Sequence, residues 1–131
     1  MWTYEITTGK MFDPTARLEG MGYSGAGADK NVPADENVPD QGPIPEGMYT
    51  IGEPFDSPDH GPYVMRLTPD ATNREYGRGG FLLHGDSIKN PGTASKGCII
   101  QSHSTRVAVG TSTDKRLQVV AIFSGLGLSN S

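Results

Sequence analysis

Short apolar runs separated by turn-forming residues recur along the chain, and they predict strands rather than long helices. Residues 2–6 alternate as a half-buried strand does, and Thr8-Gly9-Lys10 turns the chain towards Met11 and Phe12, which predicts an opening hairpin. Further strands are predicted at residues 17–23, 47–52, 63–67, 80–84, 98–101 and 117–123.

Two segments depart from this pattern. Residues 24–45 are crowded with Gly, Pro, Asn and Asp and predict a long irregular loop, whereas residues 103–109 predict a short helix capped by Ser102 or Ser104. The expected fold is mostly β: a mixed, largely antiparallel β-sandwich or flattened barrel with one short helix. Because polar loops lie at the strand ends, we expect a functional site at a rim rather than in a deep pocket.

Length and composition favour one folded domain. Residues 1–123 are predicted to form it, with residues 124–131 as a flexible C-terminal tail of small residues. Glycine and proline together make 28 of 131 residues, about 21%, which is below the roughly 25–30% typical of disordered chains. No apolar stretch approaches a membrane span, and the amino terminus lacks the basic start and apolar run of a signal peptide. We expect a protein made in the cytoplasm without a signal peptide and without membrane insertion.

The only cysteine, Cys98, follows His84 by fourteen residues, and this order suggests a cysteine enzyme. A thiol becomes a strong nucleophile as a thiolate, and an adjacent imidazole can take its proton. Residues 80–84 would deliver His84 to a strand end, and Gly97 permits the tight turn that exposes a thiol. The structural alternative is a small core cysteine and a satisfied histidine. A lone cysteine also excludes an intramolecular disulfide.

The residues around this pair resemble a known catalytic motif. His84-Gly85 followed by Ser95-Lys96-Gly97-Cys98-Ile99 is similar to the L,D-transpeptidase motif, in which a histidine-glycine pair precedes serine, a variable residue, glycine and the nucleophilic cysteine. Four blocks in order, residues 22–25, 42–51, 61–67 and 79–87, resemble the type VI secretion L,D-transpeptidase effector family. Together with the motif they span most of residues 1–122, and the family implies the same β fold.

Two positions depart from the broader L,D-transpeptidase pattern. Lys96 stands where a second histidine is common, and Ile100 and Gln101 stand where an arginine usually follows the cysteine. The effector branch varies at the first position, and its catalytic histidine matches His84. The missing arginine implies that another cation fixes the site or holds a substrate carboxylate.

The resemblance implies a reaction and a biological setting. Cys98 would attack the carbonyl at the L-centre of the diamino acid in a peptidoglycan stem tetrapeptide, and His84 would protonate the departing D-alanine. Water then gives an L,D-carboxypeptidase, and an amine acceptor gives L,D-transpeptidase exchange or cross-linking; the sequence leaves both open. A toxin of this family would travel through a secretion apparatus to the periplasm of a target bacterium, and its producer would need a periplasmic immunity protein. No cofactor is expected.

Several further residues are candidates for the same site. Backbone N–H groups near Gly97 and Cys98 are expected oxyanion donors. Asp86 would share the face of His84 and orient its ring, bind a substrate amine or cap a turn. The resemblance gives Ser95 a role through its backbone carbonyl rather than its side chain. Tyr23 and Ser24 would line the groove or belong to a turn.

Charge is divided unevenly along the chain. Residues 24–60 hold eight acids and one base, a net of −7, whereas residues 61–131 hold four acids and eight bases, a net of +4. We expect the second segment to attract an anionic substrate to the site, with a solvated surface as the alternative. The substrate-binding candidates are Arg66, Arg78 and Lys96. The acidic total and the lack of a basic, aromatic-studded motif disfavour nucleic acid.

Three other functions compete with this hypothesis. A zinc site is disfavoured because no histidine or cysteine pair has the usual close spacing, so no metal is expected, and His60 and His103 are interpreted as a turn and a helix-start residue. Papain-like peptidases place the cysteine before the histidine, the reverse of the order here. A non-catalytic cell-wall-binding module with a structural cysteine would account for the loops and cations.

Overall fold

A computed structural model of the chain describes residues 1–124, which form ten strands and one α-helix. In chain order the elements are β1 (Trp2–Glu5), β2 (Lys10–Phe12), β3 (Leu18–Met21), β4 (Tyr23–Ser24), the 3₁₀ turns Gly27–Asp29 and Pro33–Asp35, β5 (Gly47–Ile51), β6 (Phe55–Ser57), β7 (Gly61–Pro69), β8 (Leu82–His84), β9 (Ile99–Ile100), α1 (His103–Thr111) and β10 (Arg116–Val120).

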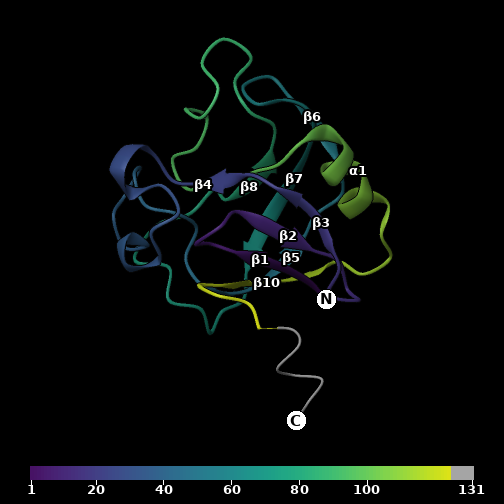
Figure 1. The fold of residues 1–131 in the computed structure, drawn as a ribbon, viewed down its shortest axis with the longest axis horizontal. Helices are drawn as coiled ribbons and strands as arrows, with labels where there is room; N and C mark the ends of the chain where they lie inside the picture. Colours follow the sequence, from purple (N-terminus) through teal and green to yellow (C-terminus); the bar gives the residue numbers. More distant parts are fainter. Residues whose placement is uncertain (125–131) are drawn as a thin grey trace.

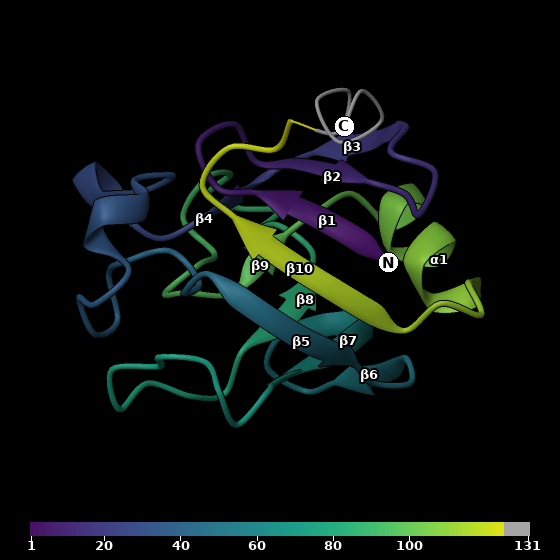
Figure 2. The same ribbon diagram turned by 90° about the horizontal axis from the view of Figure 1, so that it is seen from below.

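The strands form one mixed sheet in the order β3-β2-β1-β10-β5-β7-β8-β9-β4, with β6 paired to β7. Figure 1 shows the fold with most of these strands labelled, and Figure 2 adds the label of β9. Only two of its pairings are parallel, β1 with β10 and β8 with β9. The sheet does not close into a barrel, and the fold is sandwich-like. The prediction of a mostly β, largely antiparallel fold with one short helix is confirmed.

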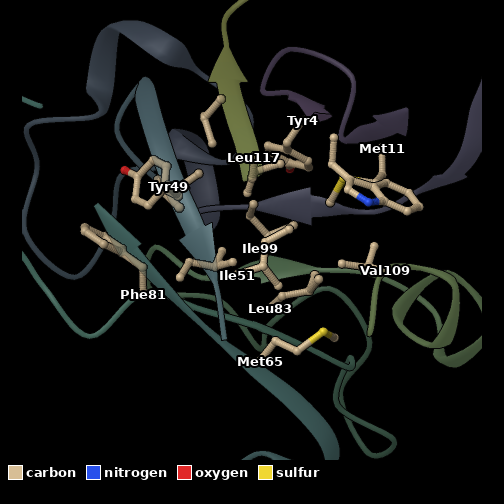
Figure 3. Packing of buried hydrophobic residues seen from close by; sticks show 14 of the residues in the cluster. Tyr4, Met11, Tyr49, Ile51, Met65, Phe81, Leu83, Ile99, Val109 and Leu117 are labelled. Atoms are coloured by element: carbon tan, nitrogen blue, oxygen red, sulfur yellow. The ribbon is translucent and has the colours of Figure 1, made fainter. Parts of the chain in front are cut away.

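Figure 2 shows β2, β1, β10 and β5 lying side by side, with α1 packed at one end. The hydrophobic core lies between this layer and the layer of β7, β8 and β9. Tyr4, Leu117 and Ile51 from the first layer meet Leu83 and Ile99 from the second (Figure 3). All of these side chains are buried. The core therefore fixes which residues of β8 and β9 point inwards.

The predicted elements differ from the observed ones in a few places. The predicted strand at 17–23 is two strands, β3 and β4, and β6 was not predicted because a three-residue edge strand has too little alternation to be detected. Ser24 belongs to β4 rather than to the loop. The helix cap is Ser102, whose side chain accepts the Thr105 N–H. Strand β10 ends at Val120. The predicted tail lies, from residue 125 on, outside the described residues.

Gly22 lies between β3 and β4, which are the first and the last strand in the order of the sheet. The two halves of the sheet, one ending in β3 and the other in β4, therefore meet at this residue. Its N–H donates to the Gly9 carbonyl at 2.7 Å, and a Cβ at Gly22 would lie 1.6 Å from the carbonyl oxygen of Ile100 in β9. Backbone of β9 thus occupies the space that a side chain at this residue would need. No helix in the described part of the chain is long and apolar enough to cross a membrane.

Substituting Gly22→Ala should destabilise the protein by about 1–3 kcal/mol or more, because the added methyl group overlaps backbone that cannot move aside cheaply. Gly79→Ala is the matched control, since nothing lies within 4 Å of a Cβ there. Urea unfolding of both variants measures the difference. Equal stability of the two variants would show that the halves are not in contact at Gly22.

Candidate active site

The candidate base ends β8, and the candidate nucleophile directly precedes β9, the strand parallel to it. Leu83 of β8 pairs with Ile99 of β9, and His84 pairs with Ile100. Because side chains alternate across a strand and Leu83 and Ile99 enter the core, His84 and Cys98 both lie on the opposite face. The apolar run at residues 81–83 forms β8, and Cys98 directly precedes β9. Two segments fourteen residues apart are thus brought together by strand pairing.

Cys98 is half-buried and lies directly before β9. Its Sγ lies 3.9 Å from the carbonyl oxygen of Gly80. Burial raises the pKa of the Cys98 thiol, and the Leu82 N–H and the Arg78 charge offset this only in part. The resting cysteine is therefore a thiol rather than a thiolate at neutral pH.

His84 is buried, with 2% of its surface exposed. Its Nδ1 lies 2.8 Å from the carbonyl oxygen of Gly85. A carbonyl only accepts, so Nδ1 carries the proton and Nε2 carries the lone pair. This Nε2 is buried and has no hydrogen-bond partner among the described residues. Burial lowers the pKa of His84 below its usual value, and the nearby His60 and Arg106 act in the same direction. The Gly85 carbonyl and Asp86 act to raise this pKa but do not outweigh burial. The ring is a neutral base with a free acceptor atom.

The two side chains are neighbours without a direct hydrogen bond between them in this structure. Their positions are diagonal across β8 and β9, because His84 pairs with Ile100 and Cys98 lies two residues before Ile100. Cys98 lines a cavity of about 460 Å³ that it shares with Phe81 and Lys96. His84 lines a separate cavity of about 520 Å³ with His60 and Asp86. Each member of the candidate pair thus lines its own cavity.

Ser95 builds the turn that presents Cys98. Its hydroxyl donates to the Cys98 carbonyl at 2.6 Å and accepts the N–H groups of Gly97 and Gly25 at 3.1 and 2.9 Å. The Gly97 N–H is therefore engaged and does not point freely at a substrate oxygen. Gly97 adopts a φ of +136°, and a Cβ there would lie 2.4 Å from a nitrogen of Arg78. The side chain of Ser95 thus shapes the turn, in addition to any role of its backbone.

Ser24 and Tyr23 approach from β4, the next strand in the sheet. The buried Ser24 hydroxyl donates to the Gly97 carbonyl at 3.3 Å and accepts the Ile44 N–H at 2.9 Å. Tyr23 reaches across β9, and its hydroxyl donates to Asp86 at 2.6 Å and accepts the Ala94 N–H at 2.9 Å. Burial, with Asp86 beside it, raises the pKa of Tyr23 to about 12. Both residues hold the loops around the site.

Asp86 organises the loop between β8 and the cysteine turn. Its carboxylate accepts hydrogen bonds from Tyr23 and from the N–H groups of Ser87 and Gly92. Burial acts to raise its pKa, but these bonds prevail and hold the pKa below its usual value. Asp86 lines the His84 cavity without bonding the imidazole. Of the roles expected for it, the turn is the one that its hydrogen bonds fill.

The three substrate-binding candidates occupy different environments. Lys96 is exposed and lines the Cys98 cavity. Arg66, on β7, packs its guanidinium 4.5 Å from the Phe55 ring centre and is not among the residues that line that cavity. Arg78 lines the cavity, but its N–H groups already bond backbone carbonyls. Those carbonyls belong to Glu36, Gly42, Pro43 and Lys96.

Two residues beside His84 were missed from the sequence. His60, interpreted as a turn residue, stacks its ring on His84 with centroids 4.4 Å apart and planes inclined by 34°. Arg106, on α1, is buried and adds positive charge next to His84. No motif marks either residue, because each comes from a segment that meets His84 only in the folded chain. Among residues 1–124, no group of three or more His, Cys, Asp or Glu side chains is arranged to hold a metal.

Comparison with known proteins yields one family. The family model described as the Tlde1 domain matches residues 19–124, which contain both Cys98 and His84. No curated protein and no solved structure shows a significant match to the chain.

The resting thiol should react slowly with iodoacetamide at neutral pH. Burial favours the protonated form, so the alkylation rate should climb only as pH rises through a pKa above the usual thiol value. Mass spectrometry reports this directly, because Cys98 is the only cysteine. The urea-unfolded chain serves as the unperturbed reference. A rate that is already maximal near pH 7 would instead reveal a preformed thiolate–imidazolium pair.

Proposed function

The chain belongs to the Tlde1 domain family of type VI secretion effectors, and we propose that it is a cysteine enzyme acting on peptidoglycan stem tetrapeptides. It would work as an L,D-carboxypeptidase, an L,D-transpeptidase, or both. The observation that carries this proposal is the parallel pairing of β8 and β9, which supports placing Cys98 and His84 on the same face, opposite to Leu83 and Ile99. The neutral ring of His84, with its free Nε2, supplies the base that such a thiol requires.

In the proposed reaction, Nε2 of His84 takes the proton of the Cys98 thiol as the sulfur attacks the substrate carbonyl. A C–S bond forms, and the carbonyl electrons move to oxygen. Collapse of this intermediate breaks the C–N bond, and His84 returns its proton to the departing D-alanine amine. The product is a thioester on Cys98. Attack by water or by an amine then releases a trimmed or exchanged stem.

Proton transfer requires sulfur and Nε2 to come within hydrogen-bond reach or to share one bridging water. Catalytic hydrogen bonds are often long in a free enzyme and shorten when substrate binds. A substrate that reached both cavities would contact both residues and exclude water between them. Displacing water also strengthens the attraction between the thiolate and imidazolium that form.

The Cys98 cavity has features suited to an anionic stem peptide. Lys96 offers a free cation at its edge, and Phe81, Gly79 and Gly80 provide an uncharged wall. The fixed charge of Arg78 lies close enough to favour the thiolate. Lys96 is therefore the cation best placed to hold a substrate carboxylate.

A type VI effector is secreted and acts in a target cell. We place its action in the periplasm, because its proposed substrate lies there. The producing cell would protect itself with a cognate periplasmic immunity protein that closes the site.

Cys98→Ala and His84→Ala should each abolish the change in muropeptides that the wild type produces, because one removes the nucleophile and the other the base. Mass analysis of tetrapeptide muropeptides is the measurement: loss of D-alanine indicates carboxypeptidase action, and D-amino acid exchange indicates transfer. His103→Ala is the matched control and should remain active, since His103 is an exposed helix residue. Unaltered muropeptides with the wild type would favour the cell-wall-binding module.

Lys96→Gln should raise KM for a tetrapeptide muropeptide more than it lowers kcat, because it removes binding shared by the ground and transition states. The effect should shrink at high salt, where charges are screened. Arg66→Gln is the matched control and should leave KM near the wild-type value. A wild-type KM for Lys96→Gln at low salt would exclude Lys96 from substrate binding.

A further inference from the structure

Arg106 is a buried cation without an anionic partner. Only 7% of its surface is exposed, and no carboxylate of the described residues lies within ion-pair distance of it. Burying an unpaired charge is costly unless hydrogen bonds compensate for the lost water. The hydrogen bonds of Arg106 all go to backbone carbonyls: its Nε donates to Gln101 at 3.1 Å, and its Nη1 donates to Pro62 and Tyr63 at 2.8 and 2.9 Å.

The Pro62 and Tyr63 carbonyls belong to an unusual stretch of backbone at the start of β7. Gly61 has a φ of +85°, and Tyr63 has a φ of +58°, a conformation that a non-glycine side chain rarely adopts. The residue directly before this stretch is His60, whose ring stacks on His84. Arg106 therefore anchors the segment that places His60.

The same guanidinium also touches the residue after His84. A Cβ at Gly85 would lie 2.7 Å from Nη2 of Arg106, so the guanidinium packs directly against the Gly85 backbone. The Gly85 carbonyl in turn accepts the Nδ1 proton of His84. One side chain from α1 thus contacts both backbone segments that carry the stacked histidines.

We propose that Arg106 is a positioning residue that holds His60 and His84 in their stacked arrangement and keeps Nε2 of His84 free to take the Cys98 proton. This inference rests on the proposed function for its catalytic consequence, but the arrangement itself is a property of the free protein. Arg106 acts through His84 and touches no reacting atom.

The charges around His84 determine the sign of the effect. His60 and Arg106 act to lower its pKa and Asp86 acts to raise it, while Asp59 and Lys89 also line the same cavity. Removing the Arg106 charge should therefore raise the pKa of His84. More of the imidazole would then be protonated near its titration midpoint, and it would lose its capacity to act as a base there.

The test is a histidine NMR titration of the wild type, Arg106→Met and the exposed control Arg17→Met. In Arg106→Met the His84 pKa should rise, and the ring-to-ring contacts between His60 and His84 should weaken. The acid limb of the kcat/KM profile should move to higher pH with it, and kcat should fall, on the order of 100-fold for a displacement of about 1 Å. Arg17→Met should match the wild type.

Gly85→Ala provides a second variant that retains the charge but pushes the guanidinium away, and it should weaken the same ring contacts. It keeps the proposal testable if Arg106→Met does not fold. An unchanged His84 pKa together with intact ring contacts in the folded variants would overturn the proposal. A wild type that is inactive on muropeptides would refute the proposed function. The titration would still decide the role of Arg106, because it needs no substrate.

Discussion

The parallel pairing of β8 and β9 is the constraint on which the rest of the site depends. These strands have only three and two residues, yet Leu83 and Ile99 anchor both of them in the core. Side chains alternate with a period of two, so a slip of one residue would turn Cys98 into the core and expose Ile99. Two hydrogen bonds from outside β8 and β9 help to fix this register: the Ser95 hydroxyl donates to the Cys98 carbonyl, and the Ser24 hydroxyl donates to the Gly97 carbonyl.

Burial gives both members of the candidate pair the same electrostatic preference. It raises the pKa of Cys98 and lowers that of His84, so each favours its neutral form. In the proposed reaction, the charged pair would therefore form as the substrate binds rather than exist beforehand. Arg78 and Arg106 act on the two residues in complementary ways, since the first favours the thiolate and the second keeps the imidazole neutral.

The acidic segment and the basic segment are in contact rather than separate. The guanidinium of Arg78 bonds three carbonyls of residues 36–43, and Asp40 lines the Cys98 cavity beside Lys96. Ser24 joins the same segment to the cysteine turn through Ile44. The glycine- and proline-rich stretch that the sequence presents as a loop thus contributes Pro39 and Asp40 to the lining of the cavity. Arg78 from the basic half and Ser24 from β4 both hold this stretch in place.

The sequence by itself determined the fold class, most strands and the short helix with a serine cap at Ser102 or Ser104, and it singled out a candidate nucleophile and a candidate base. These features are encoded locally: strands by alternation, the cap by a serine before a helix, and the motif by residues close together in the chain. Tertiary structure alone decided the contacts of His84 with His60 and Arg106, because these segments are distant in sequence and no local pattern specifies their meeting. It also decided that Arg78 bonds backbone and that Asp86 holds a loop. A side chain's partners depend on the packing of whole strands, which fixes distances that residue spacing leaves open.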